Sequence, residues 1–349
     1  MTTAIPVKNI YYLLCYAWDR LEEGAAVDIS AVDGYNLSDL FARVLLSGTK
    51  HLLRRGLDQG YLPEEAELAG IRGRISIEVT ARRMLATHGR AHCQFDDLRM
   101  DTLPNRILKS TVVYLMRLPD VSGQLRSDLA LLTKELGGIS EIRLSKPTFR
   151  RVQLHGNNRF YRFLLGICEL IFESTGVDET MGTRHFCDFF RDERRMARLF
   201  EDFVFNFYRK ERPDLDVRRE HIAWAASSAD DPELKYLPTM RTDISIRAGS
   251  RTLIIDTKYY KEVFQSYFDK QTVHSGNLYQ LFSYLKNLEA ANATAAGAAG
   301  MLLYPVVDAP VKLRYTIHSH NVCVCTVDLA QEWIGIRSQL LDLVEPLGK

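Results

Sequence analysis

Two aspartates and a lysine in the second half of the chain have the residue types and the spacing of a metal-dependent hydrolytic site. The dipeptide Gly249-Ser250 fits a two-residue hairpin turn with glycine at its first position. If the chain turns there, Asp243 and Asp256 lie equally far from the turn and face each other across the two strands. Side chains alternate along a strand, so Lys258 shares the face of Asp256.

Two directly opposed carboxylates repel each other, and a divalent cation between them removes the repulsion. Mg²⁺ suits this pair because it takes one or two carboxylates and fills its remaining positions with water and substrate phosphate oxygens. Such a metal lowers the pKa of a bound water and polarises a phosphodiester, while Lys258 could orient that water and neutralise developing charge. Asp256 and Lys258 alone could equally form an ordinary ion pair on an exposed strand, and Asp243 at the opposing position favours the catalytic interpretation.

Three further residues could complete such a site. Gln280 and Tyr284 are four residues apart in a predicted helix, so they share one helical face and could hydrogen-bond the substrate backbone. Glu201 borders the apolar face of an earlier predicted helix and could reach the metal from the opposite side. Each also has an ordinary interpretation: Gln280 and Tyr284 as residues at the edge of a core, and Glu201 as a solvated glutamate.

The elements that would position these residues follow the order α-β-β-β-α-β in the second half of the chain. Apolar residues at helical spacing predict the first helix, and Ser275 is a plausible N-cap of the second. We expect three further segments to extend the sheet and close the chain. The apolar residues of the first helix are Met196, Leu199, Phe200, Phe203, Val204 and Phe207. The predicted strands are 217–224, 240–247, 251–259, 301–306, 311–317 and 322–327, and the predicted helices include 275–288 and 330–344.

The first half has a mixed α and β pattern of its own. We predict helices at 9–21, 36–55 and 105–116, a strand at 92–97, and a strand carrying Ile75, Ile77 and Val79 in alternation. A basic and aromatic segment, 141–163, closes this half and is either a solvated loop or a surface that tracks phosphates. The polar stretch 155–158 within it is the predicted boundary, so the expected domains are 1–158 and 159–349 of a mixed α/β (α+β) chain.

Composition restricts the class of protein. A length of 349 residues predicts two domains. Lys and Arg number 45 against 44 Asp and Glu, which excludes a globally basic, tail-driven nucleic-acid binder but allows local basic patches. The chain has no apolar run near the roughly 20 residues that span a bilayer, so no membrane role is expected. Six cysteines scattered among apolar neighbours predict free thiols in a reducing cytoplasm.

Together these residues resemble a known family. The hairpin Asp243…Asp256-Thr-Lys, with a helical Glu before it and Gln-x-x-x-Tyr after it, is similar to the PD-(D/E)xK nuclease superfamily in its RecB-like form. The whole chain resembles more closely the McrC family, the endonuclease subunits of McrBC systems that restrict DNA containing 5-methylcytosine. Thr242 stands where the superfamily has its proline. The strings that carry the closer resemblance are Ile5-Pro-Val-Lys-Asn-Ile-Tyr-Tyr, Gly70-Ile-Arg-Gly-Arg, Asp101-Thr-Leu-Pro-Asn-Arg-Ile-Leu-Lys-Ser-Thr, Asp256-Thr-Lys-Tyr-Tyr-Lys, Asn277-Leu-Tyr-Gln-Leu and Gln331-Glu-Trp.

The resemblance implies a nuclease subunit that works in an assembly. By this resemblance, residues 1–158 are expected to dock on a hexameric AAA+ GTPase of the McrB type and to stimulate GTP hydrolysis. Residues 159–349 are expected to form a PD-(D/E)xK nuclease domain that cuts double-stranded DNA with modified cytosine. Asp243, Asp256 and Lys258 carry the catalytic roles with Mg²⁺, and Glu201, Gln280 and Tyr284 assist. The chain has no Walker-type phosphate loop, so GTP is hydrolysed by the partner.

Two alternatives to this assembly stay open. The chain could be a stand-alone RecB-like repair nuclease, or a non-catalytic activator of the ring. The arginine-rich stretch 70–90 could place a cation near the partner's nucleotide or could be a solvated strand edge.

Overall fold

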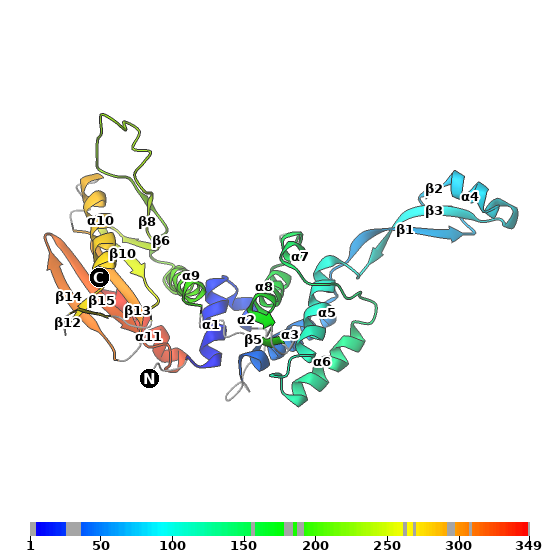
Figure 1. Cartoon of the computed structure of the whole chain (residues 1–349), viewed down its shortest axis with the longest axis horizontal. Helices are drawn as coiled ribbons and strands as arrows, with labels where there is room; N and C mark the ends of the chain where they lie inside the picture. The colour runs from blue at the N-terminus through cyan, green and yellow to red at the C-terminus, as the bar shows by residue number, and fades with distance from the viewer. Residues whose placement is uncertain are drawn as a thin grey trace. The chain divides into compact units, whose positions relative to one another are not determined.

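The computed structural model describes most of the chain and divides it into two compact units (Figure 1). One unit joins residues 1–25 to 188–349, and the other comprises 26–187. This division differs from the single boundary expected at residue 158, because the first helix packs with the C-terminal part and α8 (Arg159–Ser174) packs against the helices that precede it. The described residues are 5–25, 36–154, 158–177, 184–186, 192–260, 264–267, 270–291, 297–306 and 309–347.

The discontinuous unit is built on a six-stranded mixed sheet. The strand order is β14-β15-β13-β10-β9-β6. The central strands β10, β13 and β15 are parallel, whereas β14, β9 and β6 pair with their neighbours antiparallel. This agrees with the predicted α-β-β-β-α-β order with strands appended. The strands are β6 (Asp216–Arg218), β9 (Ile244–Ala248), β10 (Arg251–Thr257), β13 (Ala299–Pro305), β14 (Lys312–Ile317) and β15 (His320–Val327).

Helices bury both faces of this sheet. One face packs against α1 (Val7–Ala17), α9 (Glu193–Glu211) and α11 (Trp333–Val344), and the opposite face packs against α10 (Ser275–Ala291). The six apolar residues that predicted α9 are all buried. The side chain of Asp192 caps this helix by accepting hydrogen bonds from the backbone of Arg194 and Arg195, which satisfies two of its first N–H groups.

The two strands predicted before the hairpin turn are each interrupted. The first divides into β6 and β7 (His221–Ile222), and the second into β8 (Met240–Arg241) and β9. β7 and β8 form a separate two-stranded ladder. Thr242 marks the break, because its backbone N–H and its side chain are hydrogen-bonded to the backbone of Glu220 instead of continuing a regular ladder. A hairpin that the sequence did not predict, β11 (Phe264–Tyr267) with β12 (Lys270–Val273), lies before α10.

The continuous unit is a helical body that carries a long β-hairpin (Figure 1). In the hairpin, β1 (Gly60–Leu68) pairs along its full length with β3 (Ala91–Arg99), and β2 (Arg74–Ile75) adds to the other edge of β3. We call residues 60–99 the arm. The helices of the body are α3 (Leu37–Arg55), α5 (Leu103–Met116), α6 (Gly123–Glu135), α7 (Lys146–Arg150) and α8. The structure also describes α2 (Leu21–Ala25), β4 (Thr175–Val177), β5 (Arg184–Phe186) and the 3₁₀ turn Glu345–Leu347.

The tip of the arm corrects a prediction from the sequence. The alternation through Ile75, Ile77 and Val79 predicted a strand, but the strand ends at Ile75 and a helix, α4 (Ile77–Arg82), follows, then the 3₁₀ turn Leu85–His88. Ile77 is 79% exposed. Alternation predicts a strand only where a sheet buries one face, and no residue of α4 is buried.

The root of the arm is tied to the helical body by one amide. Asn105 on α5 is 1% exposed, and its Nδ2 donates to the carbonyls of Asp58, just before β1, and Met100, just after β3. Tyr161 on α8 donates its hydroxyl to Asn105 Oδ1 and accepts from the backbone N–H of Asp58. Both ends of the hairpin are therefore held to two helices by buried hydrogen bonds.

Candidate active site

The predicted hairpin register is confirmed, but its ladder ends one residue short of the two aspartates. Arg251 pairs with Ala248 and Ile255 pairs with Ile244 across the turn at Gly249, whose φ is +57°. Asp243 and Asp256 occupy the next position, beyond the last pair. They are neighbours at the open end of β9 and β10 rather than a regular cross-strand pair.

Asp256 and Lys258 form a buried ion pair. Asp256 is 0% exposed, and its Oδ2 lies 2.9 Å from Nζ of Lys258. The predicted sharing of one face by Asp256 and Lys258 is consistent with the packing, because Leu253 and Ile255, at the alternate positions of β10, belong to the core beneath α9. The face that carries Asp256 is buried beneath α10. Asp256 is therefore desolvated, which an exposed Asp–Lys pair would not be.

A chain of hydrogen bonds links Lys258 to α10. Nζ of Lys258 donates to Oε1 of Gln280 at 3.2 Å, and Nε2 of Gln280 donates to the hydroxyl of Tyr284 at 2.7 Å. That hydroxyl donates in turn to the carbonyl of Arg241 at 3.0 Å. The structure thus brings Gln280 and Tyr284 to Lys258 from one helical face, as their spacing predicted, and uses them to orient its ammonium group.

Asp243 is held by a residue that the sequence did not single out. Its Oδ2 accepts hydrogen bonds from the backbone N–H of Thr257 at 2.8 Å and from the Thr257 hydroxyl at 3.0 Å. Alternation assigns Thr257 to the face opposite Asp256 and Lys258, so pattern alone gave no reason to place it in the site. The only signal in the sequence was its position between two singled-out residues.

Glu201 lies near the site but is paired elsewhere. Its Oε1 is 3.2 Å from the guanidinium of Arg219, which also pairs with Asp202 and lies over the ring of Phe205. Burial raises the pKa of Glu201, and repulsion from Asp243 raises it further. Arg219 was missed by sequence reasoning because its partners lie on another element, α9.

The electrostatics of the site centre on Asp256. The pKa of Asp256 is raised to about 7, chiefly because the carboxyl group is buried. The charge of Lys258 opposes this shift, whereas the charges of Asp243 and Glu201 add to it. Burial alone would lower the pKa of Lys258, but attraction to Asp256 and Asp243 outweighs it, so the net pKa of Lys258 is raised. The site therefore keeps a charged ammonium group beside a carboxyl group that titrates near neutral pH.

The carboxylates fit a cation held by two protein ligands better than one held by three. Among the described residues, no three Asp, Glu, His or Cys side chains lie close enough to hold a metal together, so Glu201 is not gathered with Asp243 and Asp256. Apart from the ion pair with Lys258, neither oxygen of Asp256 accepts a hydrogen bond within the described structure. Two carboxylates, one of them buried with open acceptor positions, suit a hard cation that keeps several waters.

Comparison with known proteins identifies the family. Residues 8–305 match the family described as "McrBC 5-methylcytosine restriction system component". The chain belongs to this McrBC family. The type IV methyl-directed restriction enzyme EcoKMcrBC of Escherichia coli K12 is 39% identical over 341 residues, which cover 98% of this chain and 97% of the relative.

A solved McrBC structure has the same fold. A chain of the refined half-complex from the tetradecameric assembly of Thermococcus gammatolerans McrB AAA+ hexamers with bound McrC aligns with 97% of this chain and 76% of its own length. The TM-score is 0.62 at 17% sequence identity. The mixed α/β architecture predicted from the sequence is thereby confirmed. Within the described part of the chain, none of the helices combines the length and apolar character needed to cross a membrane.

Proposed function

We propose that the chain is the DNA endonuclease subunit of a GTP-dependent restriction complex that acts on DNA with modified cytosine. Membership of the McrBC family supports the biological role. The single observation that carries the chemical role is the fully buried Asp256, ion-paired to Lys258 and open to a further cation, next to Asp243. A purely structural ion pair would not need a second carboxylate, that of Asp243, beside the desolvated Asp256.

Asp243 and Asp256 would hold Mg²⁺ in this proposal. A bound Mg²⁺ would polarise the scissile phosphodiester and would lower the pKa of a bound water. The open oxygens of Asp256 and the fixed orientation of Asp243 by Thr257 support the assignment. Glu201, paired with Arg219, would act on the site through its charge, and its role as a direct metal ligand stays a prediction.

Lys258 would orient the attacking water and neutralise charge that develops on the phosphate. Asp256 and Gln280 both hold the Nζ of Lys258. Because the ammonium group is already ordered, little conformational entropy is lost when it acts in the reaction. Tyr284 fixes Gln280 and anchors it to the carbonyl of Arg241. Gln280 and Tyr284 would thus act by positioning Lys258, and they could also hydrogen-bond the substrate backbone.

We infer that the helical body and its arm dock on an AAA+ GTPase ring. The solved relative is described as McrB AAA+ hexamers with bound McrC, and this chain lacks a phosphate-binding loop of its own. Most arginines of the arm are engaged within it: Arg72 pairs with Asp97 and Arg83 with Glu67. Arg74 is exposed and has no ion pair among the described residues, so it is the arginine that we assign to the partner. The DNA substrate and the GTPase partner together imply work in the cytoplasm.

The experiment that tests this function separates cutting from GTPase stimulation. Asp256→Asn should abolish GTP-dependent cleavage of methylated DNA in the presence of the ring partner, while stimulation of the partner's GTPase persists. Asp216→Asn, an exposed aspartate paired with Arg218, is the matched control and should cut normally. Cleavage by Asp256→Asn would contradict the nuclease assignment, and loss of both activities would contradict the separation of roles between the two units.

A further inference from the structure

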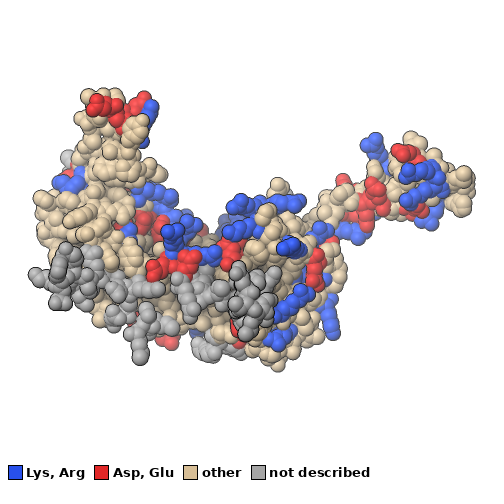
Figure 2. Space-filling view, viewed as in Figure 1, with Lys and Arg blue, Asp and Glu red and all other residues tan. Residues whose placement is uncertain are grey.

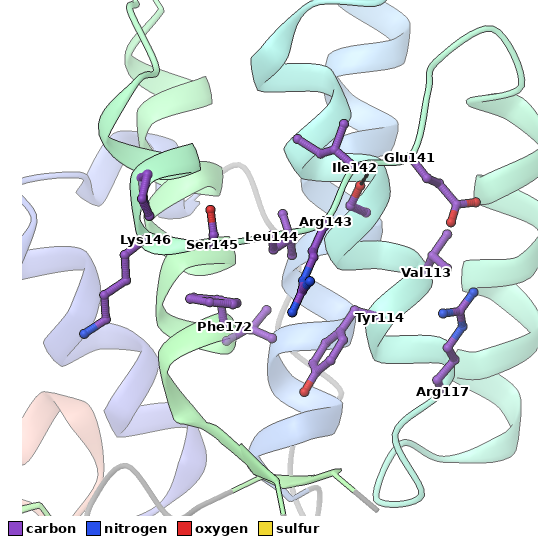
Figure 3. Close-up of a pocket in the computed structure, with 13 residues that line it drawn as sticks. Val113, Tyr114, Arg117, Glu141, Ile142, Arg143, Leu144, Ser145, Lys146 and Phe172 are labelled. Atoms are coloured by element: carbon purple, nitrogen blue, oxygen red, sulfur yellow. Dashed lines mark hydrogen bonds between the residues drawn. The ribbon is translucent and has the colours of Figure 1, made fainter.

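A basic cleft in the helical body lies outside the candidate active site. It has a volume of about 880 Å³ and is formed by α5, α8 and the segment 141–147 that connects α6 to α7 (Figure 3). Val113 and Ile171 line its apolar interior, and the half-buried rings of Tyr114 and Phe172 face it. A cleft of this size accommodates a ligand of several rings or a short stretch of polymer.

Three cations from different segments line this cleft. Arg117 ends α5, Arg143 lies in the connecting segment and Lys146 begins α7; all three are exposed. Figure 3 shows them spread across the opening, with Lys146 at one end, Arg143 in the middle and Arg117 at the other. None of the three has an ion-pair partner within the described ranges, and the lining contains one acid, Glu141. The cleft therefore offers a row of unneutralised positive charge.

The segment that carries Arg143 is fixed to the body before any ligand binds. Asp101, which also pairs with Arg106, accepts hydrogen bonds from the backbone N–H and the hydroxyl of Ser140 at 2.8 Å each. Two residues further, the backbone N–H of Ile142 donates to Oγ of Ser110 at 2.8 Å. A preorganised row of cations binds an anion with less loss of conformational entropy than cations on a mobile loop.

The positive charge continues beyond the cleft. Arg150 and Arg151 at the end of α7, and Arg159 and Arg162 at the start of α8, are exposed. Figure 2 shows Lys and Arg side chains gathered over α7 and the adjoining part of α8. Such a patch is local, because the chain as a whole has a formal charge of only +1.

We propose that this cleft binds a single DNA strand through its phosphodiester groups. Cations placed in a row match the repeating charge of a strand, and Tyr114 and Phe172 provide a surface against which a base or sugar can pack. An acidic peptide would match the charge but not the aromatic floor. A duplex, whose major groove alone is about 12 Å wide, does not enter a cleft of this volume as a whole, whereas a single strand does. The choice of DNA as the ligand rests on the proposed function, whereas the cleft and its row of cations do not depend on it.

The test measures binding of the full chain to a fluorescent single-stranded oligonucleotide, in a buffer without divalent cations so that no strand is cut. The variant carries Arg117→Gln, Arg143→Gln and Lys146→Gln together. The matched control removes three exposed cations elsewhere in the same unit, through Arg54→Gln, Arg55→Gln and Lys134→Gln. Thermal melting and stimulation of the partner's GTPase report whether each variant is folded and docks.

The cleft variant should bind the strand about tenfold or more weakly, and the slope of log affinity against log salt should fall by about two, since each phosphate contact on a single strand contributes roughly 0.7. The control should bind almost like the wild type. Phe172→Leu, which keeps an apolar side chain in the floor, should weaken binding several-fold with an unchanged salt slope. Duplex of the same length should bind more weakly than the strand and respond less to the cleft variant.

Several outcomes would overturn the proposal. Equal losses of affinity for the strand in the cleft variant and in the control would show that the strand is attracted by positive charge in general and not by the cleft. Loss of GTPase stimulation with unchanged strand binding would make the cleft a docking surface for the partner. Competition by a mononucleotide such as dCMP at the affinity of the strand would show a nucleotide site. The binding test contains no divalent cation and no cleavage step, whereas the nuclease assignment is tested by cleavage with Asp256→Asn, so failure of the cleft proposal and failure of the nuclease assignment are told apart.

Discussion

Asp256 is completely buried, and within the described part of the chain Lys258 is the one group that pairs with its oxygens, so its protonation depends on the cation beside it. In the metal-free chain its pKa, raised by burial to about 7, makes protonation the alternative to metal binding. A proton and a metal therefore compete for the same carboxyl group near neutral pH. This competition makes two properties of the protein pH-dependent.

The affinity for Mg²⁺ should rise with pH through about 7, because the metal must displace the proton of Asp256. Isothermal titration of the full chain with Mg²⁺ between pH 6 and 8 measures this, with an expected change of up to about tenfold per pH unit below the pKa. Asp216→Asn is the control and should keep the dependence. An affinity that does not change across this range would show that Asp256 is already ionised and that its burial is offset by other groups.

The stability of the metal-free chain should fall as pH rises toward 7. The pKa of Asp256 is raised from 3.8 in the unfolded chain to about 7 in the folded chain, so over this window the folded chain retains a proton that the unfolded chain has lost. Unfolding then becomes easier with rising pH, by at most about 1.4 kcal/mol per pH unit, and levels off above 7. Denaturant melts of the wild type and of Asp256→Asn check this, since the variant should lack this component.

Lys258→Ala should reduce DNA cleavage by about 10²- to 10³-fold with little change in Mg²⁺ affinity, because an ammonium group positions charge but does not coordinate metal. Single-turnover cleavage with the ring partner and a separate Mg²⁺ titration measure the two effects. Lys286→Ala, a lysine on α10 that pairs with Glu289, should leave both unchanged. A large loss of Mg²⁺ binding in Lys258→Ala would instead show that Lys258 holds the carboxylates in place.

The arm, residues 60–99, is held to the helical body by hydrogen bonds at its root. Asn105 is nearly fully buried and bonds the residues that flank both strands, and Tyr161 bonds Asn105 from α8. Of the residues in β1 and β3 only His92 and Cys93 are buried, and the two strands pair with each other along their full length. The direction of the arm relative to the helices of its own unit therefore rests on a few hydrogen bonds.

Asn105→Ala should leave two backbone carbonyls at the root without their donor, at a cost of about 1–3 kcal/mol. We expect weaker stimulation of the partner's GTPase, because the arm would no longer be presented in one orientation. Denaturant melts and GTPase assays with the ring measure both effects, and Gln124→Ala on the exposed face of α6 is the control. Unchanged stimulation despite the stability loss would contradict the role of the arm in docking.

The whole molecule is organised by a chain that leaves one compact unit and returns to it. α1 packs on α9, and Leu13 and Tyr16 share a core with Phe203 and Phe207. The side chain of Asn9 donates to the carbonyls of Leu329 and Gln331, which ties the first helix to the segment between β15 and α11. A C-terminal fragment that begins at residue 158 or 188 therefore lacks part of the core of this unit.

A fragment 188–349 should be insoluble or molten, because it exposes the apolar face of α9 that α1 covers. Residues 1–25 joined by a flexible linker to 188–349 should restore a cooperative thermal transition, and the fragment 26–187 should dock on the ring by itself. Circular dichroism melts and co-purification with the ring measure these outcomes. A well-folded fragment 188–349 that also co-purifies with the ring would contradict both the unit boundaries and the assignment of docking.

The sequence by itself determined the local features of the site. The spacing of apolar residues predicted α9, the Gly249-Ser250 turn predicted the register of β9 and β10, and the separation of Gln280 and Tyr284 placed them on one helical face. Each of these follows from helix or strand geometry over a few residues, which needs no knowledge of the rest of the fold. The same rules failed at Ile77, where no second layer completes the strand.

Only the tertiary structure decided what those residues touch. In the folded chain Asp256 is buried beneath α10, and Asp243 accepts a hydrogen bond from the backbone N–H of Thr257. Glu201 pairs with Arg219 and does not form a three-carboxylate cluster with Asp243 and Asp256 among the described residues. The tertiary structure also returned α1 to α9 and bound the root of the arm through Asn105. These contacts join residues far apart in the chain, and their free energy depends on burial and on the partner present, neither of which a local pattern contains.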